Sequence, residues 1–567
     1  MDIIETIKSQ ITGVIGNACA VLEDRGEFRF EPGFLIPIEI ETPKEKQNGD
    51  FSSNIAMKIT KMVKKPPQVT AKLLAEQFDL SGTYIERAEI AGPGFLNFYL
   101  KRDWLYDALA GILSEGAEFG KINIGGGQKV VVEFVSANPT GPMHMGNARG
   151  GVIGDVLANI LKHAGYDVTK EFYVNDAGAQ IEKFGKSLEA RYIQQLKGQD
   201  AVEFPEDGYQ GEDITEHARA YIAQFGDKLL EQDSDARRRA LIAYALPINL
   251  AAMKAGLANY NISYDEWFFE STLHKNGELE DTISLLKEKG LTYEKDGALW
   301  LKATEFGCEK DEVLIRQNGI PTYFAADIAY HRNKFSIRGF SRAINIWGAD
   351  HHGHVARLKN VLTALGLPGD QLEIILMQLV RLMRDGEVAR MSKRTGKMIT
   401  LSDLIDEIGV DAARFFFNLR HAESHLDFDL DLAVAQNSDN PVFYVQYAHA
   451  RICSILRTLK AEGVELGAPE DVDLTVLTQP EELDLIAKLA AFPQEIAISA
   501  KTTDPSRITR YVLDVAALFH SFYNAPGCRV KGGDDALTRA RLALVSAART
   551  VIQNVLHLLG ITAPETM

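Results

Sequence analysis

Apolar and polar positions follow different patterns in three parts of the chain. Residues 1–123 begin with apolar positions at helical spacing and continue into a run that alternates around Phe95, Asn97 and Tyr99, which predicts a small α+β domain. Beyond about residue 440 apolar positions recur at helical spacing almost to the end, which predicts an all-α domain. The part between them has a different character.

Continuous apolar runs in the middle of the chain are typical of strands buried on both faces. The first, QKVVVEFV at residues 128–135, leads into the turn SANPTGPMHMGNARGG and then YDVTKEFYV, a second strand. Between them apolar residues recur at helical spacing: Ile153, Val156, Leu157, Ile160 and Leu161. This order of strand, loop, helix and strand predicts an α/β, doubly wound, Rossmann-like nucleotide-binding core.

Charged and mostly helical sequence interrupts this core at residues 181–306, and we interpret it as an insertion. Strands of the parallel sheet are expected to resume at DEVLIRQ and to continue through RAINIWGAD and QLEIILMQLV. The predicted division is an N-terminal domain of residues 1–123, a core of residues 124–405, a connecting region of residues 406–440 and a helical domain of residues 441–567.

Composition narrows the class of protein. The 567 residues include 61 Lys and Arg against 78 Asp and Glu, a net charge of −17. Such an acidic chain does not coat nucleic acid by bulk charge, although local basic surfaces remain compatible with it. With 46% apolar and 25% charged residues the chain is globular rather than collagen-like, coiled-coil or disordered.

Cysteine usage and the N-terminal sequence predict a cytoplasmic protein. The four cysteines are far apart and form no CxxC motif, so we expect neither a disulfide framework nor a structural zinc site: Cys19, Cys308, Cys453 and Cys528. The first residues lack the cationic and apolar regions of a signal peptide, and we expect no membrane-spanning segment.

The turn after the first buried strand is a candidate phosphate site. A helix that starts at HMGN presents free N–H groups at the carboxyl edge of the sheet, where phosphates bind. His144 and Asn147 can donate hydrogen bonds, and Gly146 allows close approach. An HxG match occurs by chance, so a structural histidine is the alternative.

A cationic loop lies far along the chain, in VARMSKRTGKMITLSDL. It holds Arg390, Lys393, Arg394 and Lys397 around Gly396. Flexible cationic loops of this kind stabilise charge on transferred phosphate. The alternative is an ordinary solvated loop.

Together, HMGN at residues 144–147 and Met391-Ser392-Lys393 resemble the two signatures of class I aminoacyl-tRNA synthetases. Longer strings are similar to arginyl-tRNA synthetases, in the same order along nearly the whole chain: GDFSSNIAM, SANPTGPMHMGNARG, YVNDAGAQI, PTYFAADIAYH, WGADHHGH, DAARFFF, NPVFYVQYAHARI and LGITAPETM. Three positions depart from the family signatures: Asn147 replaces a second histidine, Arg390 a lysine and Arg394 a serine. We expect activity to be preserved.

The resemblance implies ATP-dependent ligation of L-arginine to tRNA(Arg) through an arginyl-adenylate, with Mg²⁺ accompanying ATP and no protein nucleophile. The catalytic residues implied are His144, Asn147 and Lys393. The ATP-binding residues implied are His144, Gly146, Asn147, Asp350, His351, Met391, Ser392 and Lys393. The family also implies a monomer, and activation of arginine that requires bound tRNA.

Selecting arginine requires a fixed acceptor for a planar guanidinium. Tyr323 and Asp327 are four residues apart in a predicted helix and project from one face, and the resemblance assigns both to the guanidinium. Glu133, an acid in an apolar strand, is assigned to the same arginine pocket, with a structural ion pair as the alternative. The resemblance also suggests that Asn138 binds the amino-acid head group.

The GADHHGH sequence also permits a metal interpretation, through His351, His352 and His354. We favour a place near ATP and arginine, with Asp350 suited to a ribose hydroxyl, and predict no metal site.

Residues for holding tRNA are predicted in both flanking domains. Lys58, Lys61, Lys64 and Lys65 would gather on one face of a helix that ends at Pro66 and Pro67, in a domain that resembles the family's tRNA-elbow-binding module. Tyr444, Tyr447 and Arg451 open the helical domain, which resembles the family's anticodon-binding bundle, and are candidates for stacking on bases. The alternatives are a solvated face and core packing.

Two other functions remain open at this stage. One is a nucleotidyltransferase that shares the HxGH motif and needs no tRNA, although such enzymes are usually shorter. The other is a synthetase-like paralogue that binds tRNA without catalysis, which the presence of His144, Asp327 and Lys393 disfavours. A nicotinamide dehydrogenase is a poor fit because no GxGxxG follows the first strand.

Overall fold

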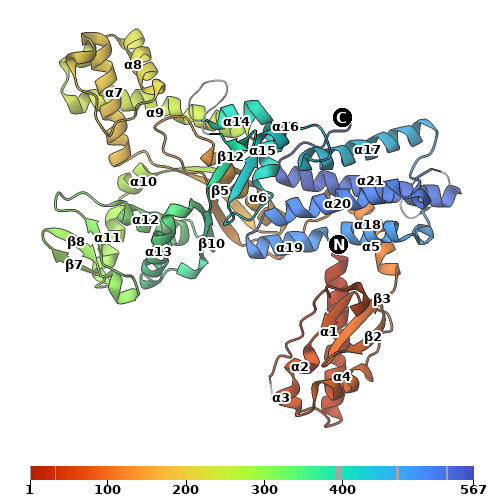
Figure 1. Cartoon of the computed structure of the whole chain (residues 1–567). Helices are drawn as coiled ribbons and strands as arrows, with labels where there is room; N and C mark the ends of the chain where they lie inside the picture. Colours follow the sequence, from red (N-terminus) through yellow and green to blue (C-terminus); the bar gives the residue numbers. More distant parts are fainter. Residues whose placement is uncertain (1, 32, 390–398, 468–470, 532–533) are drawn as a thin grey trace.

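A five-stranded parallel sheet forms the centre of the computed structural model, which describes residues 2–31, 33–389, 399–467, 471–531 and 534–567 (Figure 1). The strand order is β11-β10-β4-β5-β6. The strands are β4 (Lys129–Glu133), β5 (Asp167–Val174), β6 (Glu266–Phe269), β10 (Arg342–Gly348) and β11 (Leu372–Met377). The chain moves outward from β4 in both directions, so the sheet is doubly wound, with its switch point between β4 and β10.

The apolar run of β4 is buried on both faces because helices cover both sides of the sheet. Val130 and Val132 belong to the core that contains α6 (Gly146–His163), whereas Val131 packs in the core of α12 (Tyr323–Arg332) and α13 (His352–Ala364). This alternation follows from the two-residue period of a strand. The doubly wound core predicted from these runs is confirmed.

Close packing of α6 against β4 depends on a glycine. A Cβ at Gly154 would lie 2.1 Å from the ring of Phe134, so a larger residue would push the helix away from the sheet. The five apolar residues that predicted this helix are all buried: Ile153, Val156, Leu157, Ile160 and Leu161. The signature turn is thereby fixed to a rigid element.

Two strands differ from the expectation. DEVLIRQ contains β9 (Glu312–Ile315), which pairs antiparallel with β8 (Ala298–Leu301), itself paired with β7 (Thr292–Lys295), so its assignment to the parallel sheet is wrong. The fifth strand of the central sheet is β6, inside the segment interpreted as an insertion. With four residues, β6 is too short to show a period of its own.

Three helices that follow β5 in the chain form a separate core of their own: α7 (Ala179–Lys197), α8 (Glu212–Phe225) and α9 (Ser234–Asn259). The α9 helix and α21 (Asp535–Leu559) are each long and apolar enough to span a bilayer, but composition of this kind is weak evidence. In the structure α21 is a core helix of a bundle, and α9 packs against α7 and α8.

The N-terminal domain is an α+β unit, as predicted. Its antiparallel sheet has the order β1-β3-β2, and α1 (Ile3–Asp24) supplies most of its helical core. The elements are β1 (Phe51–Ser53), α2 (Ile55–Lys58), α3 (Thr60–Val63), α4 (Pro67–Ala75), β2 (Ile85–Ala91) and β3 (Phe95–Leu100). The single lysine-bearing helix expected before Pro66 is instead two short helices, α2 and α3, and Lys64 has a left-handed backbone, with φ of 53°.

The C-terminal domain is a helical bundle that also takes in a helix from the start of the chain. Its own helices are α17 (Pro441–Ala461), α18 (Pro480–Ala490), α19 (Phe492–Thr502), α20 (Ser506–Asn524) and α21. Helix α5 (Asp103–Glu115) packs against α18 and α21, although it belongs to the segment assigned to the N-terminal domain. Figure 1 shows α5 beside the bundle, with the remainder of the N-terminal domain hanging below.

Hydrogen bonds hold the two ends of the chain together. Lys8 and Asp2 both bond Gln494, and the Tyr106 hydroxyl donates to the Leu477 carbonyl at 3.1 Å. Asn554 donates to the carbonyls of Gly116 and Phe119, both at 3.0 Å. The N-terminal domain therefore docks on the bundle.

The connecting region joins core and bundle through a buried arginine. Arg414 of α15 (Val410–Phe417) pairs with Asp155 of α6 at 2.5 Å and donates to the Leu559 carbonyl at 2.7 Å. Around it are β12 (Val380–Arg384), β13 (Glu387–Val388), α14 (Leu401–Ile408), β14 (Leu426–Asp429) and α16 (Leu430–Val434). The remaining helices, α10 (Glu270–Lys275) and α11 (Glu278–Glu288), lie against α12.

Candidate active site

The signature turn places His144 beside the first residue of α6. The Gly146 backbone N–H donates to His144 Nδ1 at 3.0 Å, which leaves Nε2 of the exposed ring as its outward-facing nitrogen. A Cβ at Gly146 would lie 2.7 Å from the same ring, so glycine is needed for this arrangement. The helix dipole adds a positive field at this point, although the N–H groups of Gly146, Asn147 and Ala148 are bonded within the turn.

Asn147 lies one residue further into the helix. Its Oδ1 is buried and has no hydrogen-bond partner among the described residues. A buried, unpaired acceptor is costly, and such groups are uncommon in folded proteins.

The end of the cationic loop is joined to the signature turn by backbone pairing. His144 and Thr400 form an antiparallel bridge, Met145 N donates to Ile399 O at 3.1 Å, and Leu401 N donates to Met143 O at 3.0 Å. The central residues of the loop lie outside the described residues: Arg390, Met391, Ser392, Lys393, Arg394, Gly396 and Lys397.

A mostly apolar cavity of about 370 Å³ opens beside His144 and Gly146. Its walls include Met377, Val388 and Ile399, together with Leu379, which is 72% exposed. The buried Arg149 fixes one wall, because it donates to the carbonyls of Gln378, Ser424 and His421. A flat heterocyclic ring fits a lining of this kind.

A second cavity, of about 590 Å³, lies next to the first at the same sheet edge. Gly348 lines the second cavity and Met377 the first, and these two residues are partners in the β10–β11 register. Five sequence-predicted residues line the second cavity: Glu133, Tyr323, Asp327, Asp350 and His351. Both cavities therefore occupy the switch-point edge, where ligands of such sheets bind.

Helix α12 supplies Tyr323 and Asp327, and Thr322 caps its first turn. Both side chains line the cavity, as their i, i+4 spacing predicted, and Tyr323 is 43% exposed. Asp327 Oδ2 lies 2.9 Å from His354 Nε2. The carboxylate is therefore available to the cavity while one of its oxygens is held.

Glu133 has the structural ion pair that was the alternative to a pocket role, and it also lines the cavity. Its Oε2 lies 2.6 Å from Nζ of the fully buried Lys334, and its Oε1 accepts from the Ser136 hydroxyl at 3.0 Å. The Tyr330 hydroxyl is within hydrogen-bond distance of both Glu133 and Glu171. Buried carboxylates need such partners.

Glu270, the first residue of α10, was not predicted from the sequence. It is 5% exposed, and burial raises its pKa to about 7, although a hydrogen bond from Tyr173 opposes the rise and the charge of Asp327 adds to it. Within EWFFESTL nothing marks it, because its acidic neighbours are distant in sequence. Glu270 lies outside the cavity lining, but its charge and that of Asp327 influence each other, so ionised Glu270 adds negative charge near Asp327.

Asn138 is exposed and lies outside the lining of both cavities. The chain leaves β4 through Val135 and Ser136, whose φ angles are 68° and 42°. Left-handed backbone at a β-branched residue is strained and is concentrated at functional sites in proteins. Val135 and Ser136 still line the second cavity, whereas Asn138 does not.

The histidines of GADHHGH are not arranged as a metal centre. Within the described part of the chain, no three His, Cys, Asp or Glu side chains are grouped to hold a metal ion. His351 and His354 line the second cavity, whereas His352 is exposed and outside it.

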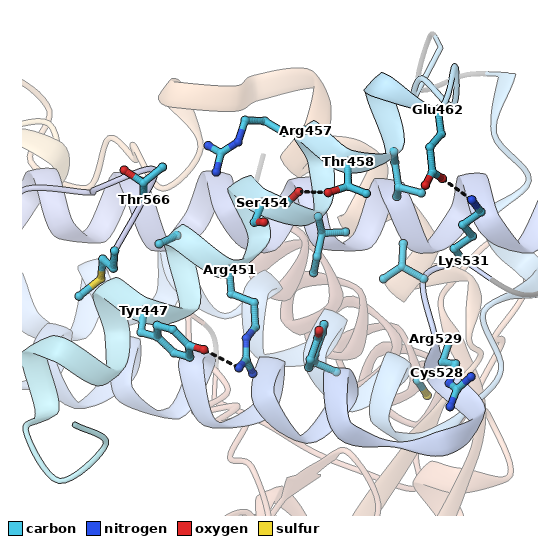
Figure 2. A pocket seen from close by; sticks show the side chains of 16 residues that line it. Tyr447, Arg451, Ser454, Arg457, Thr458, Glu462, Cys528, Arg529, Lys531 and Thr566 are labelled. Carbon is cyan, nitrogen blue, oxygen red and sulfur yellow. Dashed lines mark hydrogen bonds and ion pairs between the residues drawn. The ribbon is translucent and has the colours of Figure 1, made fainter. Parts of the chain in front are cut away.

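A third cavity, of about 800 Å³, lies in the C-terminal bundle (Figure 2). Arg451 donates to the Tyr447 hydroxyl at 2.7 Å, and its guanidinium lies over the rings of Tyr447 and Tyr523, 4.6 and 4.7 Å from their centroids. Further cations line the same space: Arg457, Arg529 and Lys531. Tyr444, predicted with them, instead packs against His520, with ring centroids 4.6 Å apart.

A fourth cavity, of about 870 Å³, lies on the N-terminal domain and is lined by Lys61, Lys64 and Lys65. Lys65 is paired with Glu27 at 2.7 Å, and Lys58, outside the cavity, is paired with Glu39. Among the described residues, Lys61 and Lys64 make no ion pair. The charges of Lys58 and Lys65 are therefore partly neutralised by glutamates, whereas within the described ranges those of Lys61 and Lys64 are not.

Comparisons with known proteins match the three parts of the chain to one family. The family model for the arginyl-tRNA synthetase N-terminal domain matches residues 5–100, that for the class I (R) catalytic domain matches residues 108–431, and that for the DALR anticodon-binding domain matches residues 445–567. The catalytic-domain model alone covers more than half of the chain.

Relatives agree over the full length. An arginine–tRNA ligase from Acetivibrio thermocellus is 59% identical over 567 residues and covers 100% of both chains. One from Ruminiclostridium cellulolyticum is 57% identical over 562 residues and covers 99% of both. The solved structure of Thermus thermophilus arginyl-tRNA synthetase has a TM-score of 0.76 at 24% identity, covers 98% of this chain and 100% of its own, and shows the shared fold. The chain belongs to the arginyl-tRNA synthetase family of class I aminoacyl-tRNA synthetases.

Proposed function

We propose that the protein ligates arginine to tRNA in two steps, with ATP in the apolar cavity and arginine in the acidic one. In the first step a carboxylate oxygen of arginine attacks the α-phosphorus of ATP, the bond to the bridging oxygen breaks and pyrophosphate leaves. In the second the 2′-hydroxyl of the terminal tRNA adenosine attacks the adenylate carbonyl, AMP leaves and the hydroxyl proton is released. The observation that carries the proposal is the acidic cavity beside an apolar one at the switch point.

Adenine would occupy the cavity beside Gly146, and the phosphates would face His144, Asn147 and the N-terminus of α6. Lys393 would approach from the loop. These groups contribute by positioning and by stabilising charge on the α-phosphate and on pyrophosphate, so that no covalent enzyme intermediate is needed. Met391 and Ser392 belong to the same loop, and Asp350 and His351, at the end of β10, would contact the ribose side of ATP.

Arginine would bind with its guanidinium between Tyr323 and Asp327, both of which line the cavity. A carboxylate and a hydroxyl aimed at fixed positions favour a planar fork of N–H donors over the point charge of lysine. Glu133 is already neutralised by Lys334, and we assign it to the wall of the pocket near the α-ammonium. Asn138 remains a candidate for the head group on the resemblance alone.

Magnesium is expected to arrive with ATP. The described residues offer no preformed group of three ligands, so the phosphate oxygens would supply most of its coordination. When bound, the ion would neutralise phosphate charge. The residues named above would do the orienting.

Transfer RNA would be held by the two flanking domains. In the bundle, Tyr447 and Arg451 offer a stacking surface and cations that suit an unpaired base and its phosphate. In the N-terminal domain, Lys61 and Lys64 offer unpaired charge to phosphates. Tyr444 and Lys58 are weaker candidates because both already have partners in the fold.

The domain boundaries, the monomeric state and the cytoplasmic location are proposals that follow the family resemblance. The four cysteines are free thiols, three of them buried, which is compatible with a reducing compartment.

ATP–pyrophosphate exchange with each of the twenty amino acids, with and without tRNA, tests the proposal. We expect exchange with arginine and with no other amino acid, and only when tRNA is present. Exchange without any amino acid would favour a nucleotidyltransferase. Tight tRNA binding with neither exchange nor charging would favour an inactive paralogue.

A further inference from the structure

Asp327 has a second partner that the proposed function does not use. Its Oδ2 lies 2.9 Å from Nε2 of His354, and the two residues come from the facing helices α12 and α13. Asp327 is about one-third exposed into the cavity, whereas the His354 side chain is 19% exposed. Both line the cavity assigned to arginine.

The surroundings of His354 determine which ring nitrogen carries the proton. Its Nδ1 lies 3.3 Å from Nη2 of Arg357. A guanidinium can only donate hydrogen bonds, so Nδ1 must be the acceptor. The proton of a neutral ring is then on Nε2, and His354 donates it to Asp327.

The ring is also held in place on its other sides. Arg357 is itself anchored, by an ion pair with Glu312 of β9 and by a bond from its Nε to the Gly353 carbonyl at 3.0 Å. The rings of Phe324 and Trp347 lie against His354, with centroids 5.3 and 5.7 Å away. A chain of contacts thus runs from Glu312 through Arg357 and His354 to Asp327.

We propose that His354 is a positioning residue for arginine recognition: it holds Asp327 Oδ2 with a neutral N–H and leaves the carboxylate charge and Oδ1 for the guanidinium. A cationic partner at this place would neutralise Asp327 before the substrate arrived. A partner without a donor would leave the carboxylate free to rotate, and preorganisation would be lost. The inference rests on the proposed role of Asp327.

A set of substitutions separates these effects. His354→Gln keeps a neutral N–H near the place of Nε2, His354→Leu removes the donor, and His354→Lys supplies a charged one. His352→Leu is the matched control, because His352 is exposed in the same run and lies outside the cavity lining. Melting temperatures report whether each variant folds.

The readouts are KM for arginine and KM for ATP in pyrophosphate exchange with tRNA present. We expect arginine KM to rise about 10-fold in His354→Leu and further in His354→Lys, since a bond to a charged acceptor is lost or the charge is cancelled. His354→Gln and His352→Leu should stay within about threefold of wild type, and ATP KM should be unchanged in all four.

The outcomes distinguish this inference from the proposals beneath it. Wild-type protein that shows no arginine-dependent exchange defeats the proposed function. If Asp327→Asn leaves arginine KM unchanged, the guanidinium role of Asp327 fails, and the inference with it. If Asp327→Asn raises arginine KM but His354→Leu and His354→Lys do not, only the inference fails. It also fails if arginine and ATP KM rise together, or if His354→Gln is as impaired as His354→Leu.

Discussion

His144 and Thr400 are partners in a backbone bridge, so the signature turn and the end of the cationic loop form one structural unit. Thr400 is also the N-cap of α14 and makes a capping box with Asp403. The described end of the loop is therefore anchored to the turn that carries His144.

Replacing Lys393 by alanine should lower the rate of adenylate formation about 100- to 1000-fold, because it removes a cation from the charge that builds on the leaving pyrophosphate. Arginine KM should change little. Pyrophosphate exchange at saturating substrates measures the effect. Lys397→Ala, in the same loop, is the control and should have a smaller effect; wild-type exchange by Lys393→Ala would remove Lys393 from the mechanism.

Asp327→Asn should raise arginine KM about 10- to 100-fold while sparing ATP KM, because an amide cannot carry the charge that a guanidinium seeks. Aminoacylation kinetics at varied arginine concentration give the value. Asp235→Asn, on the exposed start of α9, is a control for loss of one negative charge. An arginine KM equal to that of wild type would rule out the guanidinium role.

Glu270 should make stability depend on pH. Its pKa is raised to about 7 by burial, so the folded protein retains this proton between the ordinary pKa of 4.5 and pH 7 while the unfolded chain loses it. The protonated form contributes its full stability below pH 4.5, and this contribution falls as pH rises and levels off above pH 7. The free energy of unfolding decreases by about 3 kcal/mol in total over this range.

The free energy of unfolding of Glu270→Gln should therefore exceed that of wild type by up to about 3 kcal/mol at pH 8. At pH 5 the difference should be less than about 1 kcal/mol. Denaturant unfolding without substrate at the two pH values measures both. Added arginine should stabilise wild type more at pH 8, because ionised Glu270 then adds negative charge near Asp327. Equal stabilisation by the substitution at both pH values would contradict the raised pKa.

Arg451→Ala should weaken tRNA binding about 10-fold, because it removes a cation stacked on Tyr447 and Tyr523 in the bundle cavity. ATP KM should be unaffected. Equilibrium binding of cognate tRNA at fixed salt is the measurement, with Arg510→Ala, outside the cavity, as the control. Unchanged tRNA affinity would exclude this cavity from the tRNA surface.

Removing charge at Lys61 and Lys64 should reduce the salt dependence of tRNA binding by roughly two phosphate contacts. Lys61→Gln is suitable at the first position, and Lys64→Asn at the second because asparagine tolerates the left-handed backbone there. Lys58→Gln combined with Lys65→Gln is the matched control, since those lysines are already paired with Glu39 and Glu27. Equal slopes for both pairs would contradict the distinction.

Sequence patterns within single segments predicted most of the fold. The apolar run of β4, the helical spacing in α6 and the long apolar periodicity of the C-terminal domain each depend on neighbouring residues, and each has the predicted structure. The strand β6 was missed because four residues cannot show a period, and β9 was misassigned because its pairing partners are decided by tertiary packing.

Contacts between distant segments were beyond local patterns. Tyr323 and Asp327 could be predicted together because they share one helix. The sequence near Glu133 does not predict its partner Lys334, and the sequence near Asp327 does not predict its neighbour Glu270. The lysines before Pro66 could not be sorted into paired and unpaired ones, because their partners Glu27 and Glu39 lie on a loop whose path only the fold defines.

The docking of the N-terminal domain on the bundle sets an order for folding during synthesis. Tyr106 can bond Leu477 only after that residue has been synthesised, and the same holds for the bonds of Lys8 and Asp2 with Gln494. At ribosomal rates of about 5–20 residues per second, that interface stays open for roughly 25–100 s after the chain starts. The α+β unit is therefore synthesised long before its docking partner, and its docking face stays exposed to solvent until the bundle has formed.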